Sequence, residues 1–197
     1  MYIIRFLKKP ILQTLKAIMS QIHSLINENT LPKIREFDGH DWSSTRTQRR
    51  NLPHWELIGS TYFITVCVDS SLGKPFFDPL LAKTLITYLH RDDKQKYLLY
   101  AYVIMPDHLH IIIKPLAEFS LPEIMQRLKG GSAYSINKLL NRTGKFWQKE
   151  SFDHLIRDGL GLREKWDYIK ENPVKANIIE HAEDYPFSSF YVSNNLG

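Results

Sequence analysis

The chain has 197 residues, a length that suits one domain with an appendage, and 43% of them are hydrophobic, as in a globular protein with a real core. Its net charge of +5 is compatible with a nucleic-acid partner, and its single cysteine, Cys67, excludes an internal disulfide and a zinc site built from cysteines. No apolar run reaches membrane-spanning length and no convincing signal peptide is present, so we expect a cytoplasmic protein without a membrane partner.

The first 48 residues are expected to form an extension that precedes a single domain over residues 49–197. Apolar residues between Ile11 and Ile26 recur at helical spacing, which predicts a helix. That helix could pack on its own domain or on a partner, so both a monomer and a homodimer are compatible with the sequence. A polar linker follows, and its Arg49 and Arg50 could be solvated surface or could meet phosphates.

The next hundred residues alternate between strand and helix patterns. Residues 61–68 are rich in β-branched and aromatic residues, which predicts the first strand. Asp78 followed by Pro79 is typical of a helix start, and the helix is expected to run to about His90. Residues 97–105 and 107–114 then predict two strands of an antiparallel hairpin, with the tight turn between them.

The second half of the chain completes the pattern. Ser120 and Glu123 form a capping-box signature for a helix that Gly130 and Gly131 are expected to interrupt. A short strand is expected near residues 151–157. A last helix is expected over residues 162–171, ending at Asn172-Pro173 because a residue before proline disfavours helix. The order strand, helix, strand, strand, helix, strand predicts an α+β ferredoxin-like, split β-α-β fold with the last helix on the sheet.

The third predicted strand carries two histidines with one residue between them. Side chains alternate across a strand, so His108 and His110 share one face, about 7 Å apart by strand rise, while Leu109 faces the core. Two imidazoles on one face can bind one metal ion. They could also be two half-buried histidines that bond to the backbone or to a carboxylate, so the rest of the chain must supply further ligands.

Tyr168 and Asn172 are four residues apart on the last predicted helix and therefore share a helix face. If that face meets the histidines, Asn172 adds an oxygen ligand to His108 and His110, a set that suits Mg²⁺ or Mn²⁺. Tyr168 could then attack the phosphorus of a phosphodiester, with help from the metal or a base because a phenol has a pKa near ~10. Taken alone, Tyr168 would be read as an ordinary core or surface aromatic.

Two motifs together resemble a known family. The segment Pro106-Asp-His-Leu-His110, followed by residues 167–176 with Tyr168 and Asn172, resembles the REP-associated tyrosine transposases, which are single-tyrosine HUH transposases of the insertion-sequence type. Stretches at 147–148, 154–157 and 185–189 also look like that family, and the resemblance spans roughly residues 49–191. It implies a ferredoxin-like fold, metal binding by His108 and His110, and Tyr168 as the nucleophile, while Asn172 matches the family's amide position after that tyrosine.

The resemblance also implies an activity and a substrate. Such an enzyme is a divalent-metal-dependent endonuclease and strand transferase that cuts single-stranded, hairpin-containing DNA, links its tyrosine to the 5′ phosphate and releases a 3′ hydroxyl. Basic residues mixed with aromatic ones make a plausible groove for single-stranded DNA. The residues expected to contact DNA are Arg49, Arg50, Lys129, Lys138, Arg142, Lys145, Trp147 and Lys149. Ordinary solvated lysines and core aromatics are the alternative for each of them.

Two other function classes fit parts of the sequence. A non-catalytic binder could use a ferredoxin-like sheet with exposed aromatics to stack single-stranded bases, although it would not need His108, His110, Tyr168 and Asn172 together. A metal-dependent or two-histidine phosphoesterase is the second alternative. The two-histidine type would need a second His-x-Ser/Thr motif, and His154-Leu-Ile does not supply one. A covalent protein–DNA adduct separates these alternatives from a transposase.

Overall fold

The computed structural model describes residues 59–192, which lie inside the predicted domain over 49–197. The predicted extension over 1–48 and its helix fall outside the described residues, as do Arg49 and Arg50. In chain order the strands and α-helices are β1 (Thr61–Cys67), α2 (Pro79–Arg91), β2 (Tyr97–Ile104), β3 (His108–Pro115), α3 (Leu121–Leu139), β4 (Phe152–Ile156) and α4 (Gly159–Lys175). The predicted alternation of strands and helices is therefore confirmed.

The four strands form one antiparallel sheet in the order β2-β3-β1-β4. The hairpin of β2 and β3 has the predicted partners, and β1 lies between β3 and the short edge strand β4. The turn between β2 and β3 is held from both sides, because the Pro106 carbonyl accepts from Phe76 N and the Asp107 carbonyl accepts from Val68 N. The start of β3, where His108 lies, is therefore held firmly at the end of the sheet.

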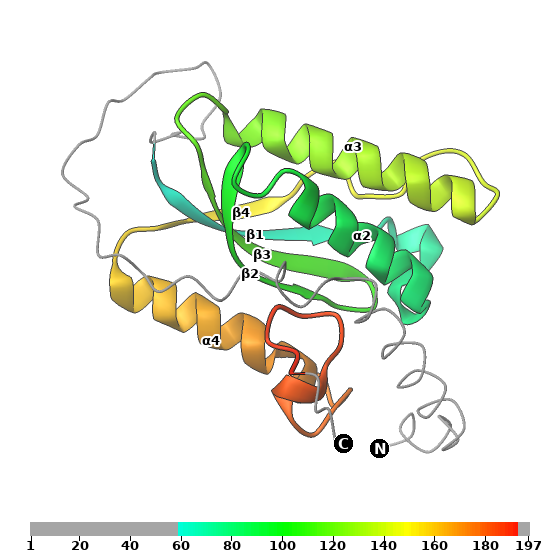
Figure 1. Ribbon diagram of the computed structural model, residues 1–197. Coiled ribbons are helices and arrows are strands. Elements are labelled where there is room, and N and C mark those ends of the chain that lie inside the picture. Colours follow the sequence, from blue (N-terminus) through cyan, green and yellow to red (C-terminus); the bar gives the residue numbers. More distant parts are fainter. Residues whose placement is uncertain (1–58, 193–197) are drawn as a thin grey trace.

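Helices cover both faces of the sheet, with α2 and α3 on one face and α4 on the other (Figure 1). Alternation along β1 assigns its side chains to these faces: Tyr62, Ile64 and Val66 are buried, whereas Phe63 and Thr65 on the α4 face are half-buried. The main core therefore lies between the sheet and the helices α2 and α3. The α4 face is only partly covered beside β1.

Both predicted helix caps are present. The Asp78 side chain accepts from Leu80 N at 2.8 Å, and Ser120 and Glu123 form the reciprocal capping box. The predicted interruption at Gly130-Gly131 is wrong, because α3 continues through both glycines. A Cβ on Gly131 would lie 2.6 Å from Cε1 of Tyr88, so glycine there lets α3 approach α2 closely. Tertiary packing, not a helix break, explains this glycine.

The last helix is longer at both ends than predicted. It begins at Gly159, where the Asp158 carboxylate accepts from Gly161 N at 2.7 Å, and it continues through Pro173 to Lys175. The predicted end at Asn172-Pro173 is therefore wrong. Proline lacks an N–H and removes one hydrogen bond of the ladder, but Pro173 and Ile169 are buried, and the packing of this face holds the helix.

The segment after α4 ties this helix to the sheet. Ser188 forms an antiparallel bridge with Val103 of β2, and the Tyr185 hydroxyl donates to the carbonyl of Ile104 at 2.8 Å. Lys170 of α4 pairs with Glu183 of this segment at 2.7 Å. The position of α4 over β2 and β3 is thus set by both its own apolar residues and the segment that follows it. Within residues 59–192, no helix combines the length and hydrophobicity needed to cross a membrane.

Candidate active site on the α4 face of the sheet

His108 and His110 face each other on β3. Their Nε2 atoms are 3.1 Å apart, and their ring centroids are separated by 4.7 Å with an interplanar angle of 75°. The ring nitrogens are thus much closer than the ~7 Å set by strand rise alone. Two ligands bound at right angles at about 2.1 Å from one metal ion are about 3 Å apart, so this spacing fits a shared metal ion.

The other nitrogen of each imidazole has its own partner. Asp107 Oδ1 is 2.6 Å from His108 Nδ1, and Thr65 Oγ1 is 2.8 Å from His110 Nδ1. Partners of this kind fix the ring orientation and leave Nε2 as the ligand atom in metal-binding histidines. Sequence reasoning missed both residues, although Asp107 is adjacent to His108 and Thr65 is a polar residue in an apolar strand.

His110 is held in its neutral form by its surroundings. It is only 4% exposed, and this burial, followed by the proximity of His108, lowers the pKa of His110 to about 3. Burial disfavours the charged imidazolium because the surrounding protein solvates a charge poorly. Neutral imidazole is the form that binds metal ions, so His110 has the protonation state that a ligand would need near neutral pH.

Tyr168 of α4 joins the histidines, as the sequence predicts. Its ring centroid lies 5.2 Å from that of His110 and 5.7 Å from that of Phe63, both with edge-on geometry. Phe63 of β1 also stacks on His110 at 5.3 Å. Tyr168 is 41% exposed, so the phenol lies at the edge of this cluster and is open to solvent and to a substrate.

Asn172 lies one turn further along α4 and is half-buried. Because α4 is continuous through Pro173, Tyr168 and Asn172 keep true α-helical spacing and project from neighbouring positions on one face. The approach of the Asn172 amide to the two histidines stays a prediction. Among the described residues, no group of three or more His, Cys, Asp or Glu side chains gathers as a metal site.

The described residues that are predicted to contact DNA lie on α3 and on the loop after it. Lys138 and Lys149 are exposed, whereas Lys129 donates to the Lys149 carbonyl at 2.8 Å and Lys145 pairs with Asp69 at 3.3 Å. Arg142 bonds to Asn137 and to the Lys145 carbonyl. This loop also runs beside the end of β1, since Gln148 N donates to the Cys67 carbonyl, and so it reaches the end of the sheet where His108 lies.

Trp147 does not offer a ring for stacking in this structure. It is 5% exposed, and its indole N–H donates to Ser132 Oγ of α3 at 3.0 Å. The neighbouring Phe146 is 1% exposed. Both aromatics belong to the core between the loop and α3, which corrects the expectation that Trp147 contacts DNA. A basic stretch mixed with aromatics looks the same in sequence whether the rings point outward or inward.

Comparisons with known proteins identify relatives of this chain. Residues 74–158, which include both histidines and end before Tyr168, match a family described as IS200-like transposases. A provisionally named REP-associated tyrosine transposase of Haemophilus influenzae is 27% identical over 143 residues, which cover 68% of this chain and 81% of that protein. A REP-associated tyrosine transposase of Escherichia coli is 30% identical over 93 residues, which cover 46% of this chain and 53% of that protein.

The fold comparison covers more of the chain. A solved structure of a REP-associated tyrosine transposase bound to a REP hairpin matches with a TM-score of 0.59 and 22% identity, over 73% of this chain and 84% of that one. At this level of identity the match shows a common fold.

Proposed function

The chain belongs to the family of IS200-like transposases, and from this premise we propose that it is a metal-dependent single-stranded DNA endonuclease and strand transferase. The observation that carries the proposal is the grouping of His108, His110 and Tyr168 on one face of the sheet. The two imidazole Nε2 atoms are 3.1 Å apart, and the Tyr168 ring centroid is 5.2 Å from that of His110. A ferredoxin-like HUH enzyme needs a metal-binding pair beside a nucleophile, and the roles proposed for these three residues would meet that need.

His108 and His110 would hold a divalent ion, Mg²⁺ or Mn²⁺, with Asn172 as the proposed third ligand. A bound ion would polarise the phosphodiester and stabilise charge that develops on its oxygens. Asp107 and Thr65 orient the two imidazoles through their Nδ1 atoms. The amide oxygen of Asn172 is a ligand type that these ions accept, which keeps the set compatible with both metals.

Tyr168 would be the nucleophile. Its phenolic oxygen loses a proton and forms a bond to phosphorus, while the bond from phosphorus to the 3′ oxygen breaks. The departing oxygen takes up a proton and becomes a free 3′ hydroxyl, so neither water nor a redox partner is consumed. The DNA keeps its 5′ phosphate on Tyr168, and attack by a 3′ hydroxyl in the reverse sense rejoins a strand and frees the tyrosine.

The proposed substrate is a DNA hairpin with unpaired flanks, similar to a repetitive extragenic palindrome. The relatives named as REP-associated transposases, and the solved structure with a REP hairpin, support this choice. The exposed Lys138 and Lys149 can contact phosphates of the hairpin. Lys129, Arg142 and Lys145 can do the same if phosphates replace the protein groups that they now contact. We propose the same role for Arg49 and Arg50.

The test is formation of a covalent adduct. The protein is incubated with single-stranded hairpin DNA and Mg²⁺ or Mn²⁺, and the products are separated on a denaturing gel. We expect a slower band for the wild type and none for Tyr168→Phe, which keeps the ring but removes the attacking oxygen. Tyr134→Phe is the matched control, because Tyr134 is 72% exposed on α3 and lies away from the histidines.

Each result has one meaning. An adduct in Tyr168→Phe that is lost in Tyr134→Phe would move the nucleophile to Tyr134 and leave the enzyme class intact. Binding of hairpin DNA without any wild-type adduct would favour a non-catalytic single-stranded nucleic-acid binder.

A further inference from the structure

Phe152 lies in line with the candidate active site. In the register of the sheet, Phe152 of β4 is opposite Thr65 of β1, and Thr65 is opposite His110 of β3. Directly opposed residues of antiparallel strands place their side chains on the same face. Neighbouring strands are about 4.8 Å apart, so the backbone of Phe152 is about 10 Å from that of His110 across the sheet.

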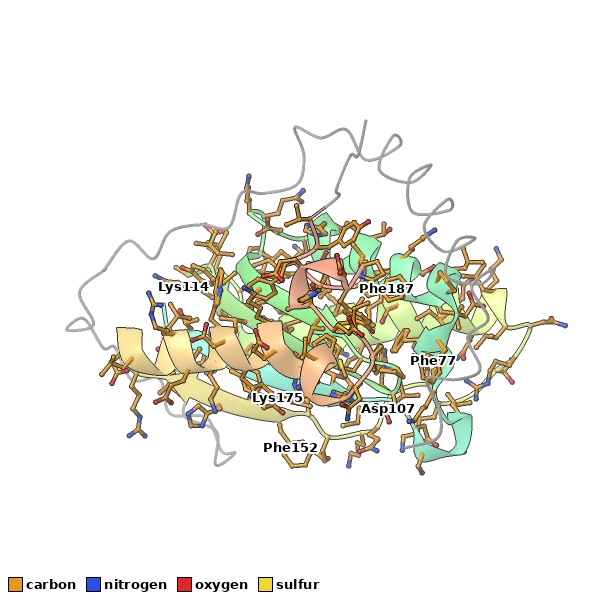
Figure 2. All side chains as sticks on the ribbon, turned by 90° about the horizontal axis from the view of Figure 1, so that it is seen from below. Phe77, Asp107, Lys114, Phe152, Lys175 and Phe187 are labelled. Atoms are coloured by element: carbon orange, nitrogen blue, oxygen red, sulfur yellow. The ribbon has the colours of Figure 1, made fainter. Side chains whose placement is uncertain are left out.

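The Phe152 ring is open to solvent, with 71% of the residue exposed. In Figure 2, which looks onto the α4 side, Phe152 projects from β4 beyond the part of the sheet that α4 covers. Two residues along, the exposed His154 is opposite Phe63, whose ring stacks on His110 and meets the edge of Tyr168. The exposed part of β4 is therefore continuous with the aromatic cluster of the site.

A single exposed aromatic is ordinary, and Phe77 provides the comparison. It is 57% exposed, but it lies in the short 3-10 segment before α2, with Lys74 Nζ 5.9 Å from its ring centroid. Phe77 and Phe152 occupy separate parts of the molecule in Figure 2. What distinguishes Phe152 is its register with Thr65 and His110, not its exposure.

Two lysines of α4 lie beside the aromatic rings of the site. Lys165 Nζ lies 5.3 Å from the ring centroid of Phe63, and Lys175 Nζ lies 5.8 Å from that of Tyr168. Lys165 and Lys175 lie three residues before and seven residues after Tyr168 on α4, so both flank it on the same helix face; Lys175 is exposed and Lys165 is half-buried. Cationic side chains next to accessible aromatic rings are the combination that binds unpaired nucleotides, because the lysines meet phosphates and the rings stack on bases.

We propose that Phe152 is a stacking platform for an unpaired base that neighbours the phosphodiester bound at His108 and His110. This rests on the proposed function and adds a contact that selects single-stranded DNA over duplex at the site. In a duplex the faces of the bases are stacked on each other and cannot reach the ring. In a single strand one base can turn onto Phe152 while its phosphates run past Lys165 and Lys175.

The experiment uses a hairpin oligonucleotide whose unpaired flank carries the fluorescent base 2-aminopurine, with binding measured in a Tyr168→Phe background so that the DNA stays intact. The variants compared with that background are Phe152→Leu, Phe152→Trp and the matched control Phe77→Leu. We expect Phe152→Leu to weaken binding roughly tenfold and to abolish part of the 2-aminopurine quenching, because base–aromatic stacking is lost. Phe152→Trp should retain both, and Phe77→Leu should change neither.

A blunt duplex of the same length provides the second arm, and Phe152→Leu should leave its weaker binding unchanged. Equal single-strand affinity and quenching for Phe152→Leu and Phe77→Leu would overturn the inference, even if the wild type forms the covalent adduct. If Phe152→Leu weakens binding but the wild-type protein never forms an adduct with the same hairpin, the platform stands and the proposed chemistry is rejected. The two proposals therefore fail separately.

Discussion

Replacing Thr65 with valine should weaken metal binding without disturbing the strand. Thr65 Oγ1 is 2.8 Å from His110 Nδ1, whereas the facing Nε2 atoms of His108 and His110 are 3.1 Å apart. Valine keeps the β-branched shape that suits β1 but removes the hydroxyl. The His110 ring then loses the contact that sets its orientation and leaves Nε2 directed at the proposed ion.

The size of the effect follows from the role of Thr65. Loss of a partner that orients a metal-binding histidine costs about 10- to 100-fold in metal affinity, which is about 1.4–2.8 kcal/mol. His110 is 4% exposed, so its Nδ1 cannot easily exchange Thr65 for water. Leaving that nitrogen without a partner should also lower the free energy of unfolding by about 1–3 kcal/mol.

The assay is titration of the purified protein with Mn²⁺, in which binding is measured by calorimetry or from the paramagnetic signal of the free ion. Thr65→Ser is the matched control, because serine keeps a hydroxyl at the same position, and it should recover most of the affinity. DNA binding without metal should be the same in all three proteins, since Thr65 is not part of the basic surface. Urea unfolding monitors stability independently of the metal.

A Thr65→Val protein that binds Mn²⁺ with wild-type affinity would refute the reasoning. It would mean either that His110 does not bind the ion or that its ring is held by the stacked Phe63 alone. His110→Ala separates these two cases. It should leave the Mn²⁺ affinity unchanged in the first case and lower it in the second, because only then is His110 a ligand.

Two further predictions concern the site and the helix pair. His108→Ala removes one of the two imidazoles proposed to hold the ion. It should abolish cleavage of hairpin DNA, measured on a denaturing gel, and largely spare DNA binding, measured by mobility shift. An equal loss of binding would indicate that the histidine pair is structural. Gly131→Ala should lower the free energy of unfolding in urea by about 1 kcal/mol, since overpacking against Tyr88 costs about 1–3 kcal/mol and alanine returns up to ~1 kcal/mol of helix propensity. Gly130→Ala, with nothing within 4 Å of its Cβ, should raise it by up to ~1 kcal/mol, and equal effects at the two glycines would contradict the close packing.

Features that depend on a few neighbouring residues could be predicted from the sequence. The caps at Asp78 and Ser120 are local hydrogen bonds between a side chain and the next turn, so the residue types indicate them directly. The shared face of His108 and His110 follows from strand alternation in the same way. The pairing of Tyr168 with these histidines came from the resemblance of two motifs sixty residues apart, not from local patterns.

The errors occur where packing between distant segments overrides a local preference. Gly130, Gly131 and Pro173 disfavour helix locally, but α3 and α4 continue through them. The helix α3 packs closely against α2 where Gly131 faces Tyr88, and α4 buries Ile169 and Pro173. The sequence around Trp147 favours an aromatic that stacks on bases, whereas in the structure its indole N–H donates to Ser132.

The sequence by itself determined which residues are the candidates for the proposed chemistry: two histidines on one strand face, and a tyrosine and an amide on one helix face. Only the tertiary structure decided what surrounds them. Thr65 and Phe63 meet His110, and Phe152 lies in line with it, because β1 pairs with β3 on one side and with β4 on the other. That register is set by the whole sheet, since a shift of one residue would exchange its two faces, and no local pattern in β4 specifies which residue of β1 it meets.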